Sequence, residues 1–187
     1  MVLPSAQMQA ELADVSLQAE CLFDLASIAT ALDKMADQLN RQFMDKYPLV
    51  LTVMNGGLVA AGQLLPKLSF PLTLDYVHAT RYRDTLAGGG INWLAKPATD
   101  MTGRHILLVD DIFDEGITLK AIVDFCRHNG AASVTTAVLC EKLHARKVAD
   151  FSIDYAAVSV PDRYVFGLGM DYKGFYRNAP GIFALAD

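Results

Sequence analysis

The sequence predicts a single α/β domain whose largely parallel sheet is covered on both faces by helices. Apolar segments of strand length alternate with segments of helical periodicity from residue 49 onward. The chain has 187 residues, of which 52% are hydrophobic, so it can bury one sizeable core. It contains no internal repeat and no linker, and residues 1–187 are therefore expected to form one domain.

The first 45 residues have a helical pattern. Their apolar residues recur at steps of three and four, which places them on one face of a helix. These residues are Ile28, Leu32, Met35, Leu39 and Phe43. Pro48 ends the segment.

Strands and helices then alternate along the chain. We expect strands at 49–54, 72–80, 105–110, 133–140 and 153–160, with short strands near 164–169 and 181–186. We expect helices at 57–65 and 118–130. Gly130 ends the second helix. Residues 81–103 hold no clean period.

Composition argues against several classes of protein. The net charge of -5 without basic clusters is unlike a nucleic-acid surface. No apolar run approaches the roughly 18–20 residues of a membrane span. The acidic start of the chain does not resemble a secretory signal, and the histidines lack the HExxH spacing of a zinc site. Cys21, Cys126 and Cys140 form no CxxC pair, which suits free thiols in a reducing cytoplasm.

The stretch ILLVDDIFDEGITLKAI, residues 106–122, leads a buried strand into acidic residues and then into a helix. Ligands of parallel α/β sheets bind beyond the carboxyl ends of the strands, where we expect Asp110 and Asp111. Their carboxylates could accept hydrogen bonds from sugar hydroxyls or hold a divalent cation.

The loop at residues 114–118 suits a phosphate group. Unpaired N–H groups and the positive end of a helix dipole attract anions at a helix start. Gly116 allows a tight turn, and Thr118 can cap the helix and offer a hydroxyl. Together with the acidic pair, this loop predicts a site for a phosphorylated sugar.

Three other interpretations compete for this stretch. A Walker phosphate loop requires GxxxxGK[ST], which is absent here. A response-regulator receiver also has a strand ending in two aspartates, but the 76 residues after Asp111 are too few for the rest of that fold. A solvated acidic loop capped by Thr118 remains open.

The arrangement from Ile106 to Thr118 resembles the phosphoribosyl diphosphate (PRPP) signature of type I phosphoribosyltransferases. The run VPDRYVFGLGMDYKGFYRN, residues 160–178, is similar to the purine-binding segment of hypoxanthine-guanine phosphoribosyltransferases. VMNGG, residues 53–57, stands where that family places its pyrophosphate loop. Order and spacing agree from about residue 49 to residue 178.

The resemblance implies a role for each matching residue. PRPP, through its ribose and 5′-phosphate, would be bound by Asp110, Asp111, Asp114, Glu115, Gly116, Ile117 and Thr118. Pyrophosphate would be bound by Asn55, Gly56, Arg81, Tyr82 and Arg177. The purine would be bound by Lys142, Tyr164, Val165 and Asp171, with Lys142 donating to the 6-oxo group and Tyr164 stacking on the ring. Asp114 would be the general base, and Mg²⁺ would be held by Asp110, Asp111 and Asp171.

Several positions depart from the commoner family pattern. Asn55 stands where many members have lysine, and Arg81 where serine is frequent. Glu115 and Ile117 replace a hydroxyl residue and a cation in the phosphate loop. Because a carboxylate repels phosphate, we expect the Glu115 side chain to point outward.

The resemblance also implies an architecture and partners. A small hood would combine residues of about 1–45 with about 160–187, the core would span about 46–159, and a lid over about 81–98 would exclude water as it closes, burying Trp93. The implied substrates are PRPP and a 6-oxopurine, namely hypoxanthine and guanine. The implied protein is a cytoplasmic homodimer or homotetramer without nucleic-acid or membrane partners. The alternatives are another base, such as xanthine, or a PRPP-sensing regulator, for which the sequence supplies no DNA-binding domain or basic face.

Overall fold

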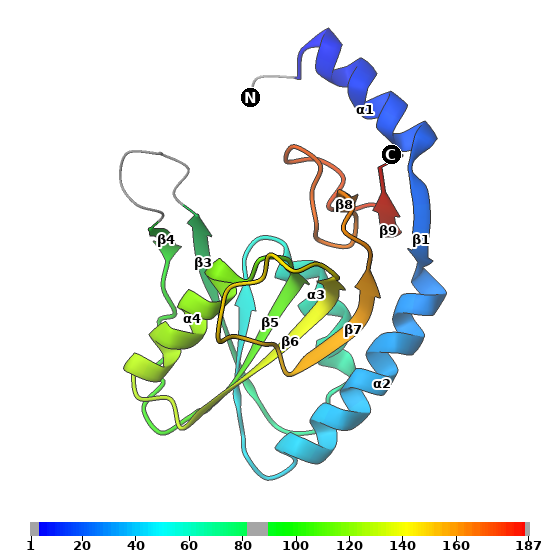
Figure 1. Cartoon of the computed structure of the whole chain (residues 1–187). Helices are drawn as coiled ribbons and strands as arrows, with labels where there is room; N and C mark the ends of the chain where they lie inside the picture. Colours follow the sequence, from blue (N-terminus) through cyan, green and yellow to red (C-terminus); the bar gives the residue numbers. More distant parts are fainter. Residues whose placement is uncertain (1–3, 82–89, 186–187) are drawn as a thin grey trace.

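The structure is a computed structural model that describes residues 4–81 and 90–185. Its centre is a six-stranded sheet in the order β4-β3-β2-β5-β6-β7 (Figure 1). The strands are β2 (Leu49–Val53), β3 (Thr73–Arg81), β4 (Ile91–Ala95), β5 (His105–Phe113), β6 (Ser133–Lys142) and β7 (Tyr155–Val160). Only β4 is antiparallel to its neighbour, so the mostly parallel α/β sheet is confirmed.

Helices cover both faces of this sheet. Alternate residues of β5 point to opposite faces, as the two-residue period of a strand requires. Leu107 packs in one hydrophobic cluster with α2 (Leu25–Phe43) and α3 (Gly57–Leu64). Leu108 packs in the other cluster with α4 (Ile117–His128). The five apolar residues predicted for the α2 stripe are all buried.

A second, three-stranded antiparallel sheet joins the two ends of the chain. Its order is β1-β9-β8, from β1 (Glu20–Asp24), β9 (Gly181–Ala184) and β8 (Val165–Phe166). Together with α1 (Ala6–Gln18), it lies beyond the carboxyl ends of β5, β6 and β7 (Figure 1). Any ligand at those strand ends is therefore bounded by both sheets.

The N-terminal segment differs from the helical expectation. Strand β1 interrupts it, because Glu20–Asp24 pairs with β9 from the other end of the chain. Asp24 then caps α2, since its Oδ1 accepts a hydrogen bond of 2.8 Å from the Ser27 N–H. The predicted hood also included residues up to about 45. In the structure, α2, which occupies most of residues 25–45, packs against the large sheet.

The segment expected to be a lid contains a strand. Residues 91–95 form β4, whose residues alternate between half-buried and exposed as it pairs with β3. Trp93, expected to leave water only when a lid closes, is already half-buried against Phe125, with ring centroids 4.7 Å apart. Residues 82–89 of the predicted lid, including Tyr82, lie outside the described residues.

Across residues 4–81 and 90–185, no helix combines the length and apolar character needed to cross a membrane. Cys21 is exposed, and Cys126 and Cys140 are buried. All three are free thiols, as predicted. Burial raises the pKa of Cys126 to about 11 and that of Cys140 to about 12, so neither is a reactive thiolate.

Candidate active site

The phosphate loop, residues 114–118, connects β5 to α4. Gly116 has φ +83°, and a Cβ at this position would lie 2.3 Å from the Phe113 ring, so only glycine fits the turn. Helix α4 begins at Ile117 with Gly116 as its N-cap. Thr118 is therefore the second residue of the helix and not its cap, which corrects the expectation and leaves its hydroxyl near the loop.

A cavity of about 220 Å³, here called the phosphate cavity, opens at this loop. Its lining residues are Arg81, Asp110, Ile112, Asp114, Glu115, Gly116, Ile117, Thr118 and Leu119. The first N–H groups of α4 face this region and have no partner within the helix. The arrangement suits an anion, and a phosphate at this loop stays a prediction.

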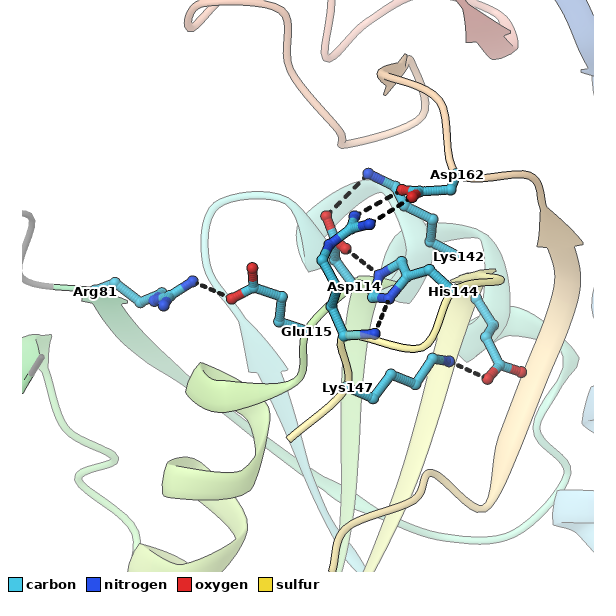
Figure 2. Close-up of polar contacts among 9 residues, drawn as sticks. Arg81, Asp114, Glu115, Lys142, His144, Lys147 and Asp162 are labelled. Carbon is cyan, nitrogen blue, oxygen red and sulfur yellow. Dashed lines mark hydrogen bonds and ion pairs between the residues drawn. The ribbon is translucent and has the colours of Figure 1, made fainter. Parts of the chain in front are cut away.

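The side chain of Glu115 does not point away from this cavity as expected. Its Oε2 lies 2.5 Å from Nη1 of Arg81, which comes from the end of β3 (Figure 2). The guanidinium thus neutralises the carboxylate that would otherwise repel a phosphate.

The acidic pair lies within β5, with Asp110 three residues and Asp111 two residues before the strand ends at Phe113, and not at its end. Asp111 is buried, and Asp110 is half-buried. Burial, and then the charge of Asp111, raises the pKa of Asp110 well above its ordinary value; burial likewise raises the pKa of Asp111. In the absence of a ligand, ionising both carboxyls is therefore costly.

The loop of residues 53–57 packs directly against the acidic pair. A Cβ on Gly56 would lie 1.8 Å from Oδ2 of Asp111, so this close approach requires glycine. The peptide between Met54 and Asn55 is cis, and the Asn55 side chain is exposed. Gly169 closes the other side, where a Cβ would lie 2.1 Å from the Gly56 carbonyl oxygen.

Asp171 and Arg177 form an ion pair beside this loop. Nη2 of Arg177 lies 2.5 Å from Oδ1 of Asp171, and its Nη1 donates to the Gly169 carbonyl. The other carboxylate oxygen of Asp171 accepts a hydrogen bond of 2.6 Å from the Gly174 N–H. The segment after β8 therefore brings Asp171 and Arg177 next to Gly56, although they are more than 110 residues apart in the sequence.

A second cavity of about 200 Å³, here called the aromatic cavity, lies between the phosphate loop and the small sheet. It is lined by Asp111, Ile112, Asp114, Lys142, Tyr164, Val165, Met170 and Asp171. The Tyr164 side chain is exposed, packs edge-on against Tyr172, and donates from its hydroxyl to the Asp171 carbonyl. All four residues predicted to bind a base line this one cavity.

Asp114 lines both cavities and is the centre of a hydrogen-bond network (Figure 2). Lys142, the last residue of β6, donates from Nζ to Oδ2 at 2.9 Å. His144 Nε2 lies 2.6 Å from Oδ1. Burial works to raise the pKa of Asp114, but the hydrogen bonds from Lys142 and His144 outweigh it and lower the pKa. Asp114 is therefore an ionised acceptor near neutral pH.

The sequence analysis did not identify His144. A single histidine in a loop has no periodic or motif signal, and its position follows only from the packing of the segment after β6. Its distance of two residues from Lys142 was the available clue.

The carboxylates at these cavities do not form a complete metal site of their own. They suit a magnesium ion that binds together with a phosphate ligand. Among residues 4–81 and 90–185, no three His, Cys, Asp or Glu side chains form a group able to hold a metal. The carboxylates of Asp110 and Asp111 are oxygen donors at the rim of the two cavities. Mg²⁺ commonly takes one or two carboxylates and completes its coordination with substrate phosphates and water.

Known proteins are similar to this chain in sequence and fold. The phosphoribosyl transferase domain family matches residues 18–173. The chain is 32% identical to a hypoxanthine-guanine-xanthine phosphoribosyltransferase of Tritrichomonas foetus, over 86% of this chain and 88% of the relative. It is also 32% identical to the hypoxanthine-guanine phosphoribosyltransferase of Streptococcus pneumoniae, over 86% and 89%. A solved structure of the hypoxanthine phosphoribosyltransferase of Trypanosoma cruzi superposes with a TM-score of 0.83 at 29% identity, covering 90% of this chain and 96% of that one.

Proposed function

Because the chain belongs to the phosphoribosyl transferase family, we propose that it is a purine-salvage enzyme that transfers the 5-phosphoribosyl group of PRPP to N9 of a 6-oxopurine. Hypoxanthine and guanine would give IMP and GMP, with pyrophosphate as the second product. The relatives named above carry these bases in their names.

One observation carries the proposal: the phosphate cavity and the aromatic cavity share Asp114 and Ile112. A sugar phosphate in the first cavity would therefore present its sugar to a flat base in the second. Bringing two reactants together in this way removes much of the entropic barrier to their reaction.

The residues around the aromatic cavity support a defined transfer step. N9 of the purine would attack C1′ of the ribose as the bond from C1′ to pyrophosphate breaks. The proton on N7 would pass to Oδ2 of Asp114, which is ionised because hydrogen bonds hold its pKa low. The positive charge that develops on the ribose would be stabilised by the nearby carboxylates.

Lys142 supports the choice of a 6-oxopurine. Its ammonium can donate hydrogen bonds but cannot accept them, so it matches a carbonyl oxygen and not the amino group of adenine. In the free protein it is held by Asp114, and only 12% of its side chain is exposed. Purine binding would move the ammonium from Oδ2 of Asp114 to the 6-oxo group and leave that oxygen for N7.

The proposed cofactor is Mg²⁺, bound together with PRPP. Asp110, Asp111 and Asp171 are the residues that would lie closest to it, directly or through water and the ribose hydroxyls. When bound, the ion supplies positive charge that stabilises the departing pyrophosphate. Arg177 and the N–H groups of residues 55–57 would contact the same pyrophosphate from the protein side.

The proposed location is the cytoplasm. Its support is the presence of three free cysteines, which suits a reducing compartment. A homodimer or homotetramer remains our expectation for the assembly.

Turnover assays with hypoxanthine, guanine, xanthine and adenine, each with PRPP and Mg²⁺, test this function. We expect nucleotide and pyrophosphate from hypoxanthine and guanine, and none from adenine. Turnover of xanthine would widen the base range. Binding of PRPP without turnover of any base would contradict the enzyme proposal and favour a PRPP sensor.

A further inference from the structure

The imidazole of His144 lies buried behind Asp114. Only 2% of its side chain is exposed, and its Nε2 is 2.6 Å from Oδ1 of Asp114 (Figure 2). His144 lines neither the phosphate cavity nor the aromatic cavity. An effect of His144 on a ligand in those cavities is therefore indirect, and Asp114 is the cavity residue that its side chain contacts.

The hydrogen bonds of His144 determine which ring nitrogen carries the hydrogen. The backbone N–H of Arg146 donates to Nδ1 at 3.0 Å. A nitrogen that accepts a hydrogen bond has no hydrogen of its own, so the hydrogen is on Nε2 and points at Asp114. The ring is thus an N–H donor to the carboxylate.

The turn that orients His144 is itself held in place. The Arg146 guanidinium forms two hydrogen bonds with Asp162, at 2.6 and 2.8 Å. The Val148 N–H donates to the Glu115 carbonyl at 2.8 Å, which ties the same segment to the phosphate loop. The imidazole is therefore held at both ring nitrogens, by Asp114 at Nε2 and by the Arg146 N–H at Nδ1. Its burial keeps water from replacing Asp114 as the partner of Nε2.

The two oxygens of Asp114 have partners of different kinds. Oδ2 is held by Lys142, whose flexible side chain ends at the aromatic cavity. Oδ1 is held by His144, whose side chain is buried and whose ring accepts a hydrogen bond from the Arg146 N–H. When a ligand attracts the ammonium, Oδ2 becomes free, whereas Oδ1 stays bound.

From this geometry we propose that His144 is a positioning residue for the transfer reaction: it holds Oδ1 of Asp114 so that Oδ2 faces the purine. The inference rests on the proposed function, in which Asp114 accepts the purine proton. A third group that orients a catalytic base is a common feature of acid–base sites.

The charged groups around this pair determine the expected pH dependence. Besides His144, Asp114 faces Lys142, and the adjoining segments bring Arg146, Asp162, Glu115, Asp111 and Cys140 close enough to interact. The hydrogen bond from His144 is among the causes that lower the pKa of Asp114. Its loss should raise that pKa and move the acid limb of kcat/KM to higher pH.

Two variants separate the hydrogen bond from the packing. His144→Leu fills the site without a donor, whereas the amide of His144→Gln can reach Oδ1 with an N–H. We expect kcat with hypoxanthine to fall about 10- to 100-fold in His144→Leu, the range typical of partners that orient a reactive group. PRPP affinity should change less than about threefold, and His144→Gln should recover much of the rate. His128→Leu, which removes an exposed histidine of α4, is the control.

Nuclear magnetic resonance supplies readouts that do not need turnover. In the wild-type protein, ring ¹⁵N shifts should show the hydrogen of His144 on Nε2, and a ¹³C titration of Asp114 should give a higher pKa in His144→Leu. A hydrogen on Nδ1, or equal rates and acid limbs in both variants and wild type, would overturn the inference. Wild-type protein without turnover of any base would instead contradict the proposed function, while the NMR readouts still report on the pair.

Discussion

Arg81 and Glu115 form an ion pair at the rim of the phosphate cavity, although one ends β3 and the other follows β5. The pair places a guanidinium beside a loop whose position 117 is isoleucine and so offers no cation. Both side chains remain well exposed. Arg81 was expected to contact pyrophosphate, but in the free protein it lies at the cavity predicted for the 5′-phosphate.

Replacing Glu115 tests what the carboxylate does. Glu115→Gln frees Arg81 and removes a negative charge near the bound phosphate. Because exposed ion pairs are worth at most about 1 kcal/mol, we expect PRPP to bind up to about fivefold more tightly. Calorimetric titration with PRPP measures the change, and Arg81→Gln should weaken binding instead. Weaker PRPP binding by Glu115→Gln would show that the Glu115 carboxylate either contacts PRPP itself or is needed to hold Arg81 in position.

Lys142→Met tests base recognition. It removes the donor to the 6-oxo group but keeps most of the apolar side chain. A charged hydrogen bond is worth about 1.5–3 kcal/mol, so kcat/KM for hypoxanthine should fall roughly 10- to 150-fold while the Kd for PRPP changes little. Lys34→Met on the exposed side of α2 is the matched control. Equal losses for both substrates would count against a contact with the base.

Most of the large sheet and its helices could be predicted from local patterns. The stripe from Ile28 to Phe43 and the apolar run before Asp110 have the periods of helix and strand, and burial followed those periods. β1 and β4 could not be predicted in the same way. β1 pairs with a strand from the opposite end of the chain, which no local pattern can reveal, and β4 lies in residues 81–103, where the sequence holds no clean period.

The site was predictable where a motif carries it. Residues of the PRPP signature and of the segment after β8 line two adjoining cavities, and their roles toward PRPP and a purine stay predictions. His144 and the pairing of Arg81 with Glu115 were not predicted. Both depend on where separate segments meet in space, and a single polar residue in a loop does not reveal its partner.

The acidic pair should lower the stability of the free protein at neutral pH. Since the folded-state pKa of Asp110 is raised, the carboxyl stabilises the fold below its unfolded pKa and loses that effect as pH rises through the folded pKa. Asp110→Asn should therefore raise Tm near pH 7 by roughly 2–4 °C, for a gain of about 1 kcal/mol, with the difference vanishing at low pH.

Calorimetric unfolding scans from pH 3 to pH 8 measure this effect. Asp37→Asn, on the exposed side of α2, should show no such pH-dependent gain. PRPP binding should weaken in Asp110→Asn, because an NH2 donor replaces one of the two carboxylate oxygens that accept hydrogen bonds from the ribose hydroxyls. If Asp110→Asn were less stable than wild type at pH 7, other groups in the protein would already offset the cost of burying the Asp110 charge.

Gly169→Ala tests the close contact between the loop of residues 53–57 and the segment after β8. Its Cβ would lie 2.1 Å from the Gly56 carbonyl oxygen, whereas a Cβ on Gly174 meets nothing within 4 Å. Both glycines have positive φ, 110° and 88°, so Gly174→Ala controls for backbone strain. We expect Gly169→Ala to lower the free energy of unfolding, measured in urea, by at least about 2 kcal/mol more than Gly174→Ala does. Gly169→Ala should also weaken pyrophosphate binding. Equal losses would mean that backbone strain alone sets the cost.

Asp114→Asn separates catalysis from binding. The phosphate loop backbone should survive, so the Kd for PRPP should change only a few-fold, but an amide cannot accept the purine proton. General-base assistance is typically worth about 10²- to 10⁴-fold in rate, and we expect kcat to fall by that order. The low pKa keeps the wild-type carboxylate ionised as pH falls, so the variant should lose most at low pH and least at high pH, where more of the purine is already anionic. Steady-state rates from pH 5 to pH 10 measure this, and near-normal kcat at neutral pH would show that the proton goes elsewhere.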